Sequence, residues 1–205
     1  MALLLLIRHG PTATTGKVLY GRMPGLSLTE SGREGARRLG AALADVPLAA
    51  IYTSPMERAQ ETAAAIAEGR KLAPEVHAGL NEIDYGDWTG RSLAGLRKLR
   101  AWRTVVFQPS RMAFKNGETM LEAQHRAVIT VEEMAARHRG RTVAAVAHGD
   151  LIKSAVAYYL GLGFDLYQRL VPAPLGLAAL ELPQVGMPRL LAWNWTPDGT
   201  SWKPR

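Results

Sequence analysis

The hydrophobic residues of this chain occur in short unbroken runs and in helical stripes that alternate along the sequence. Apolar runs without polar alternation are typical of strands buried on both faces of a parallel sheet, and stripes at i, i+3, i+4 spacing are typical of helices that cover such a sheet. The expected strands are residues 3–7, 50–53 and 142–147, and the helices that follow them are residues 29–43, 54–68 and 151–160.

A further long helix and a hairpin are expected in the second half of the chain. The helix is outlined by an apolar stripe and ends near Gly140; the stripe consists of Leu121, His125, Val128, Ile129 and Ala135. Two strands at residues 175–182 and 189–195 flank a Pro/Gly turn, which predicts a hairpin at the sheet edge. Residues 92–100 favour a short helix, whereas residues 74–90 and 103–117 show no clear element.

Two helix starts carry capping signals. Thr29 precedes the first helical stripe and is expected to be its N-cap. Ser54-Pro55-Met56-Glu57 has the pattern of a capping box with proline at the first helical position. Alternation of strands and helices indicates an α/β fold with a mostly parallel sheet. We expect a single domain over residues 1–205, with residues 197–205 as a loose tail.

Composition and charge narrow the function classes. Apolar residues make up 47% and charged residues 21% of the chain, which are ordinary globular values. The net charge of +7 invites a nucleic-acid interpretation, but the basic residues are spread along the chain without a dense block. An anionic small-molecule substrate explains them equally well. There is no cysteine, which excludes disulfides, thiolate zinc sites and a cysteine nucleophile.

The first apolar run ends at Arg8, is too short for a signal-peptide core, and is better interpreted as a buried strand. No apolar stretch approaches the roughly twenty residues that a membrane span needs. We therefore expect a cytoplasmic protein that neither enters a membrane nor binds nucleic acid. The oligomeric state is not visible in the sequence.

Basic side chains stand where three predicted strands end. Arg8 and His9 follow the first strand, Arg58 lies in the first turn after the second strand, and His148 follows the third. Taken singly, each has a plainer explanation as a solvated turn or helix residue. In a parallel sheet, however, the strand ends share one edge, where ligands bind. Such a concentration of positive charge requires a multiply charged anion, and a phosphoryl group matches guanidinium geometry.

Four segments resemble the signature motifs of the histidine phosphatase superfamily, which has the phosphoglycerate mutase-like fold. In chain order they are Arg8-His9-Gly10-Pro11-Thr12, Ser54-Pro55-Met56-Glu57-Arg58-Ala59-Gln60-Glu61-Thr62-Ala63, Leu80-Asn81-Glu82-Ile83-Asp84-Tyr85-Gly86-Asp87-Trp88-Thr89-Gly90 and Ala147-His148-Gly149. The resemblance covers most of the chain. It implies a single-domain three-layer α/β/α sandwich and places the chain nearer the phosphatase branch of the superfamily.

The resemblance also implies roles for five residues. His9 corresponds to the nucleophile that forms a phosphohistidine, Glu82 to the proton donor, and Arg8, Arg58 and His148 to the phosphate pocket. Neighbouring arginines are expected to lower the pKa of the nucleophilic imidazole and keep it unprotonated. Such a mechanism uses no cofactor and no metal. The competing hypothesis, a divalent-metal site in the acidic loop around Glu82, lacks a recognisable ligand spacing.

Several positions of the resemblance concern substrate binding. Thr12 and Gly149 match positions that often touch phosphate, and Thr15 stands where many relatives carry asparagine. Gly21 and Arg22 resemble a substrate-side Gly-Arg of some phosphatases. Specificity is expected to come from the loops at Lys17–Leu28 and Arg100–Gly117, because binding determinants concentrate in loops on a rigid scaffold.

Three functions remain open at this stage. The favoured one is a phosphomonoesterase that acts on a small phosphorylated metabolite. The second is a mutase that uses the same phosphohistidine; the glycolytic mutases usually carry tryptophan and asparagine where this chain has Thr14 and Thr15, and a longer insert than residues 89–147. The third is a noncatalytic module that binds phosphorylated ligands, since a fold alone does not prove activity.

Overall fold

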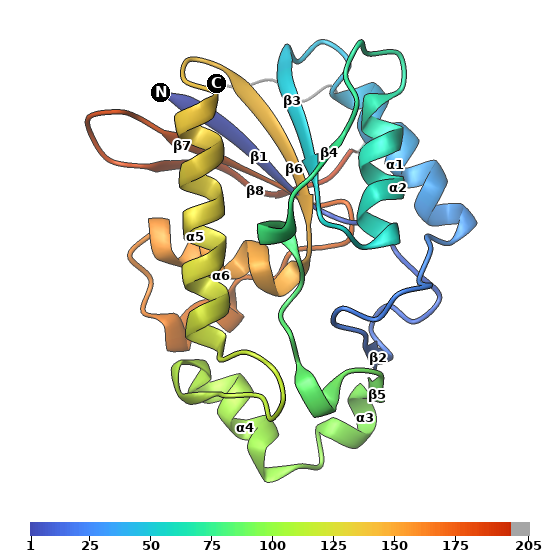
Figure 1. Cartoon of the computed structure of the whole chain (residues 1–205), viewed down its shortest axis with the longest axis vertical. Helices are drawn as coiled ribbons and strands as arrows, with labels where there is room; N and C mark the ends of the chain where they lie inside the picture. The colour runs from blue at the N-terminus through green and yellow to red at the C-terminus, as the bar shows by residue number, and fades with distance from the viewer. Residues whose placement is uncertain (198–205) are drawn as a thin grey trace.

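The computed structural model describes residues 1–197 and is built around a six-stranded sheet with the order β4-β3-β6-β1-β7-β8 (Figure 1). The strands are β1 (Ala2–Arg8), β3 (Leu48–Thr53), β4 (Glu75–Val76), β6 (Thr142–Ala147), β7 (Leu177–Leu182) and β8 (Arg189–Trp195). The first four positions in the sheet are parallel to one another, and the β7–β8 hairpin adds an antiparallel edge. The mostly parallel sheet and the edge hairpin are thus confirmed.

Helices cover both faces of the sheet. The helices α1 (Glu30–Ala42) and α2 (Glu57–Ala67) lie on one face, and α5 (Met120–Arg137) and α6 (Gly149–Tyr159) lie on the other (Figure 1). Along β1, Leu4 and Leu6 pack toward α5 and α6, whereas Leu5 and Ile7 pack toward α1 and α2. Burial of successive side chains on opposite faces explains the unbroken apolar run, and it confirms the single-domain three-layer fold.

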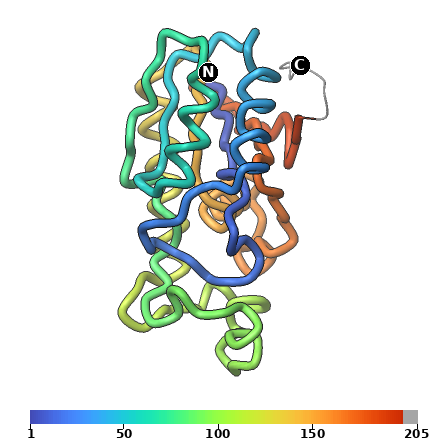
Figure 2. Tube along the Cα trace, turned by 90° about the vertical axis from the view of Figure 1, so that its right-hand side faces the viewer, coloured from blue at the N-terminus to red at the C-terminus, as the bar shows by residue number. Residues whose placement is uncertain are grey.

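A smaller set of elements lies beyond the carboxyl ends of the parallel strands, as the green segments of Figures 1 and 2 show. It contains a two-stranded antiparallel sheet and two short helices: β2 (Val18–Leu19), β5 (Arg91–Ser92), α3 (Leu93–Leu96) and α4 (Arg100–Phe107). Short 3-10 turns complete it: η1 (Ala78–Leu80), η2 (Gly86–Trp88), η3 (Pro109–Arg111) and η4 (Phe164–Arg169).

This region has its own apolar core, although residues 74–90 and 103–117 show no clear element in the sequence. Trp88 stacks on Trp102 with a ring-centroid distance of 6.2 Å and meets Phe114 edge-on. Ile83 and Leu96 are fully buried in the same cluster. Residues 74–90 contain only short turns and a two-residue strand, as their loop-like sequence predicts, whereas residues 103–107 complete a helix that the sequence did not define. The apolar residues of this region follow neither helical nor strand periodicity and are ordered by contacts between distant segments.

One capping prediction is confirmed and one is wrong. The Thr29 hydroxyl accepts a hydrogen bond from the Gly32 N–H, as expected for an N-cap. The second of these helices begins only at Glu57, and its N-cap is Met56 without a side-chain bond. The Ser54 hydroxyl instead lies 2.8 Å from Nε2 of His148. The same hydroxyl accepts from the Met56 N–H at 3.3 Å, so it is shared between a buried imidazole and the backbone just before the helix.

The predicted core face of α5 was also wrong. Leu121, His125 and Ile129 are exposed, whereas the buried positions are Met120, Ala123, Ala127, Thr130, Val131 and Met134. The buried face combines small residues with Met120, Val131 and Met134, whereas Leu121 and Ile129 remain on the outer face. No helix within residues 1–197 is both long enough and apolar enough to cross a membrane. The predicted tail lies outside the described residues, apart from its first residue.

Candidate active site

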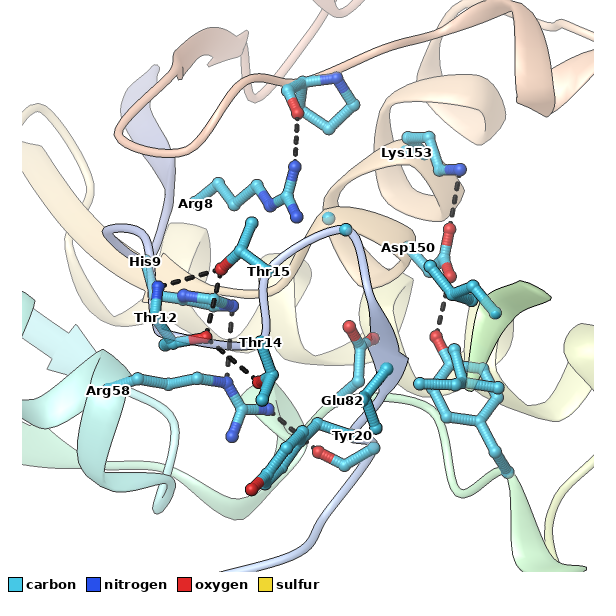
Figure 3. Close-up of a pocket in the computed structure, with 18 of the residues that line it drawn as sticks. Arg8, His9, Thr12, Thr14, Thr15, Tyr20, Arg58, Glu82, Asp150 and Lys153 are labelled. Carbon is cyan, nitrogen blue, oxygen red and sulfur yellow. Dashed lines mark hydrogen bonds and ion pairs between the residues drawn. The ribbon is translucent and has the colours of Figure 1, made fainter. Parts of the chain in front are cut away.

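The ends of β1, β3 and β6 bring four basic side chains together. Arg8 pairs in register with Ala147, so His9 and His148 leave neighbouring strands at the same level. The Arg58 Nε–H lies 3.3 Å from Nε2 of His9, and Arg58 Nη2 lies 3.2 Å from Nδ1 of His148. The two imidazole centroids are 5.2 Å apart. The juxtaposition that the sequence predicted is therefore present, and Figure 3 shows part of it.

Hydrogen bonds define the tautomers of the two histidines. Nδ1 of His9 lies 2.7 Å from the Gly10 carbonyl oxygen, which can only accept, so Nδ1 carries the proton. Nε2 therefore carries no proton, and its lone pair accepts the Arg58 Nε–H. In His148 the arrangement is reversed: Nε2 faces the Ser54 hydroxyl, and Nδ1 accepts from Arg58.

Both imidazoles are neutral in this environment. Burial, followed by the positive charges of Arg58 and Arg8, lowers the pKa of His9 to about 3. Burial also holds the pKa of His148 well below its usual value, with His9 and Arg58 adding to the effect. The sequence analysis anticipated the direction for His9 and named the arginines, but desolvation is the larger cause.

Two guanidinium donors in the site have no partner among the described residues. These are Nε of Arg8 and Nη1 of Arg58, both buried. Other nitrogens of the same groups are occupied: Arg8 Nη1 donates to the Pro172 carbonyl, and Arg58 Nη2 donates to the Gly21 carbonyl. Unsatisfied buried donors are costly. Their presence on two cations beside the unprotonated Nε2 of His9 is the arrangement that an oxyanion would complete.

Residues of the two glycine-rich turns shape this end of the site. Thr12 donates its backbone N–H to Oγ1 of Thr15 at 2.8 Å, and the two hydroxyls lie 3.0 Å apart. A Cβ atom added to Gly149 would stand 3.3 Å from Nε of Arg8, closer than almost all real contacts. All of these residues line a cavity of about 540 Å³, together with Gly21. His148 is fully buried behind Arg58 and does not line it.

Glu82 lines the same cavity and comes from the acidic loop before η2. Its Oε1 atom accepts from the backbone N–H of Ile83 at 2.9 Å. Burial, followed by the negative charge of Asp150, raises the pKa of Glu82 to about 7. A carboxyl group with this pKa exchanges protons at neutral pH, which suits acid–base chemistry.

Asp150 is a site residue that the sequence analysis missed. Its carboxylate accepts from the Tyr85 hydroxyl at 2.6 Å and lies 2.6 Å from Nζ of Lys153 (Figure 3). Burial pushes the pKa of Asp150 upward, but Lys153 and the two hydrogen bonds outweigh it, and the net shift is downward. Asp150 thus stays ionised beside Glu82. The only signal in the sequence was its position directly after His148-Gly149.

Substitution of Asp150 by asparagine is expected to lower the pKa of Glu82. The negative charge of Asp150 disfavours ionisation of Glu82, and its removal leaves Lys153 as an additional positive influence, so both changes act in the same direction. Carbon-13 NMR of the Glu82 carboxyl during a pH titration would measure the shift, with Asp87→Asn as a control on the same loop. An unchanged or higher pKa for Glu82 would contradict this electrostatic account.

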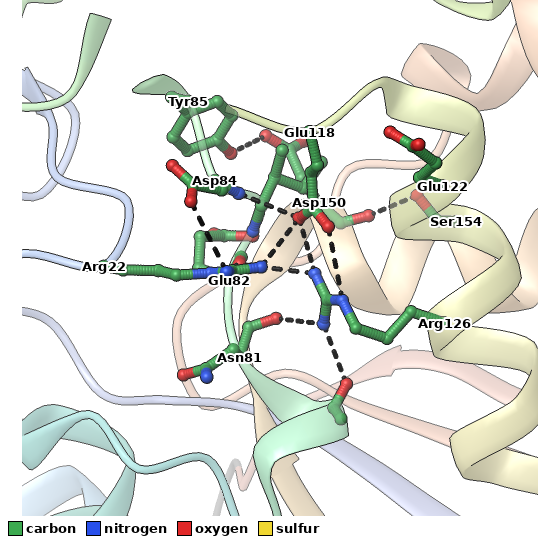
Figure 4. A network of polar contacts seen from close by, with 12 residues as sticks. Arg22, Asn81, Glu82, Asp84, Tyr85, Glu118, Glu122, Arg126, Asp150 and Ser154 are labelled. Carbon is green, nitrogen blue, oxygen red and sulfur yellow. Dashed lines mark hydrogen bonds and ion pairs between the residues drawn. The ribbon is translucent and has the colours of Figure 1, made fainter. Parts of the chain in front are cut away.

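Arg22 occupies a different place from the one that the sequence predicted. It does not line the cavity; its Nε donates to the Glu82 carbonyl at 2.8 Å, and its Nη2 bonds to Glu118 at 2.9 Å. Arg126 approaches the same Glu118 carboxylate at 2.7 Å from the other side (Figure 4). Two adjacent residues of one loop therefore contact the phosphate end and the acidic loop: the Gly21 carbonyl accepts from Arg58, and Arg22 donates to the Glu82 carbonyl.

The competing metal hypothesis finds no arrangement of the kind it requires. Within residues 1–197, no group of three or more His, Asp or Glu side chains is placed to hold a metal ion. The acidic groups of the loop contact other side chains of the protein instead: Asp84 pairs with Arg22, and Asp87 accepts from Asn116.

Comparison with known proteins identifies relatives over most of the chain. Residues 4–196 match the model of the histidine phosphatase superfamily, branch 1. Phosphoserine phosphatase 1 of Hydrogenobacter thermophilus is 30% identical over 168 residues, covering 81% of this chain and 79% of that protein. A 2,3-bisphosphoglycerate-dependent phosphoglycerate mutase of Bartonella bacilliformis is 31% identical over 176 residues, covering 79% of this chain and 83% of that protein.

A solved structure gives the same result. Bacillus stearothermophilus YhfR superposes with a TM-score of 0.86 at 32% identity, covering 93% of this chain and 95% of that one. The matched region contains every strand of the central sheet except the first two residues of β1, and all the site residues described above. From its sequence, its fold and its site, the chain belongs to the histidine phosphatase superfamily, branch 1.

Proposed function

We propose that this protein is a phosphomonoesterase that hydrolyses a small phosphorylated metabolite through a phosphohistidine on His9. The observation that carries the proposal is the neutral Nε2 of His9 beside two buried cations with unpartnered donors, Arg8 and Arg58. Relatives that are phosphatases support the hydrolytic reaction.

In the first step, Nε2 of His9 attacks phosphorus and the bond to the alcohol oxygen breaks. Glu82, protonated at neutral pH in about half of the molecules, gives its proton to the departing oxygen. Arg8 and Arg58 hold the equatorial oxygens, on which negative charge is spread, and His148 acts on this pocket through its contact with Arg58. Arg58 turns its Nε–H from His9 to the phosphoryl group when the substrate enters, which frees the nucleophile.

In the second step, water attacks the phosphohistidine. The Glu82 carboxylate takes one proton from the water, and the bond between phosphorus and Nε2 breaks to release inorganic phosphate. Thr12, Thr15, Gly21 and Gly149 form the walls around the phosphoryl group in this proposal. Arg22 acts through the backbone of Glu82 rather than on the substrate.

Hydrolysis is favoured over mutase action by the charges of the cavity. A mutase of this type holds a bisphosphorylated intermediate and needs cations for two phosphoryl groups. Beyond Arg8 and Arg58, the cation that lines the described cavity is Lys153, and its charge is compensated by Asp150. The cavity therefore offers the charge for one phosphoryl group, which leaves water as the acceptor.

Turnover of phosphate monoesters, combined with trapping of the phosphoenzyme by an alkaline denaturing quench, tests the proposal. We expect steady release of inorganic phosphate, no effect of EDTA, and an acid-labile phosphohistidine that is absent in a His9→Ala blank. Isomerisation of 3-phosphoglycerate with little release of phosphate would instead establish a mutase. Phosphate binding without any phosphoenzyme would establish a noncatalytic module and end the proposal.

A further inference from the structure

The cavity continues beyond the phosphate end into an outer chamber with apolar walls. The walls come from the loop at β2, from α3 and α4, and from the segment after η4 (Figure 1). The chamber residues are Val18, Leu19, Tyr20, Leu26, Leu93, Trp102, Val106, Leu170, Val171 and Pro172. These segments include parts of both loops that the sequence analysis associated with specificity.

The charged residues next to the chamber, Lys153 and Asp150, form an ion pair with each other. Lys153 is 8% exposed, and its ammonium lies 2.6 Å from Asp150, 2.9 Å from Oε1 of Gln168 and 4.5 Å from the centroid of the Tyr167 ring. Each direction in which the ammonium can donate is thus occupied within the protein. Among the described residues, the chamber offers no other cation to a second anionic group of a substrate.

The polar groups near Lys153 are also engaged. The amide nitrogen of Gln168 donates to the Val105 carbonyl at 3.2 Å and to the Tyr167 hydroxyl at 3.1 Å. Asp150 and Glu82 add negative charge to this end of the cavity. A carboxylate on the substrate would lose its hydration here without gaining a cationic partner and would approach the negative charge of Asp150.

We propose that the natural substrates are phosphate monoesters of uncharged, largely apolar alcohols, whose aromatic or alkyl group packs in the outer chamber. This inference rests on the phosphomonoesterase function proposed above. It separates this chain from relatives whose names refer to phosphoserine and to glucosyl-3-phosphoglycerate, because those compounds carry a carboxylate. The apolar group of the substrate would be buried against Trp102, Leu93 and Leu170, which stabilises the complex. A carboxylate in the same place would be repelled by Asp150.

Steady-state kinetics with esters of primary alcohols tests the proposal, because their leaving groups are chemically similar. We expect kcat/KM for 2-phenylethyl phosphate to exceed that for 3-phosphoglycerate and phosphoserine by about tenfold or more, the worth of one partly buried ring. If either carboxylate-bearing ester is turned over as well as 2-phenylethyl phosphate, the inference is wrong although the phosphatase stands. If no ester is hydrolysed and no phosphohistidine forms, the proposed function itself fails.

A cation placed in the chamber provides a matched pair of variants. Val106 lines the chamber from α4, whereas Ala101 is exposed on the same helix and does not line it. Val106→Lys is expected to shift the ratio of kcat/KM for 3-phosphoglycerate to kcat/KM for 2-phenylethyl phosphate toward 3-phosphoglycerate by about tenfold. Ala101→Lys adds the same charge outside the chamber and is expected to leave this ratio unchanged. Equal ratios in the two variants would contradict the assignment of the chamber.

Equilibrium binding gives a result that is independent of catalysis and of how the variants fold. Calorimetry on the native chain would compare 3-phenylpropylphosphonate with 4-phosphonobutyrate, two stable phosphonates that differ in the aromatic or carboxylate end. We expect the aromatic compound to bind about tenfold more tightly or better. Equal or tighter binding of the carboxylate would overturn the proposal.

Discussion

Replacement of His9 by alanine is expected to lower kcat/KM for phosphate monoesters by about 10⁴-fold or more and to abolish the phosphoenzyme. The reason is the position of Nε2: Gly10 holds the proton on the other ring nitrogen, and burial with Arg58 and Arg8 keeps the ring neutral. Without this atom, water would have to attack phosphorus directly. Phosphate release measures the loss of turnover, and trapping by an alkaline denaturing quench measures the loss of the phosphoenzyme.

The matched control for this experiment is His125→Ala. His125 is exposed on the outer face of α5, away from the cavity, and its loss is expected to leave turnover unchanged. Thermal unfolding of both variants separates loss of chemistry from loss of fold. If His9→Ala still forms an acid-labile phosphoenzyme, the nucleophile has been misassigned, and His148 would be the next residue to test.

Substitution of Glu82 by glutamine is expected to have the second largest effect, and one that depends on the leaving group. For 2-phenylethyl phosphate we expect kcat to fall by about 10²- to 10⁴-fold, the usual contribution of general acid catalysis. For p-nitrophenyl phosphate the loss is expected to be much smaller, because the nitrophenolate leaves without a proton. A loss of kcat that is much larger for 2-phenylethyl phosphate than for p-nitrophenyl phosphate identifies Glu82 as a proton donor to the leaving group.

The pH profile gives the same test a second readout. Glu82 must be protonated to donate, and its pKa is raised to about 7, so kcat of the native chain for alkyl esters is expected to fall as the pH rises above about 7. In Glu82→Gln this alkaline limb is expected to disappear. Asp87→Asn, on an exposed carboxylate of the same loop, serves as the control. Equal losses for both esters, or an alkaline limb that persists, would rule out proton donation by Glu82.

The residues of the phosphate end were predictable from the sequence because each directly follows a buried strand or opens a helix. The apolar runs that end at Arg8 and at Ala147 define strands with little ambiguity, and parallel pairing places the next residues, His9 and His148, side by side. Local signals sufficed here because a strand's carboxyl end has a defined place in a parallel sheet.

Where side chains find distant partners, local patterns gave the wrong answer. Ser54 fits a capping box, but its hydroxyl faces His148, which lies 94 positions later in the chain. The apolar stripe through Leu121 and Ile129 predicted the buried face of α5, yet these two side chains are exposed, and Ala123 and Ala127 lie on the face that packs on the core. Arg22 was assigned to the substrate and instead bonds to the Glu82 carbonyl.

By itself, the sequence determined the layered α/β fold and the basic cluster at its strand ends, since both follow from short-range patterns of apolar and charged residues. Only the tertiary structure decided the protonation of Glu82, which depends on burial and on Asp150, and the apolar chamber that α3 and α4 help to build. Desolvation and cavity walls arise from segments brought together across the chain, and no local pattern contains them.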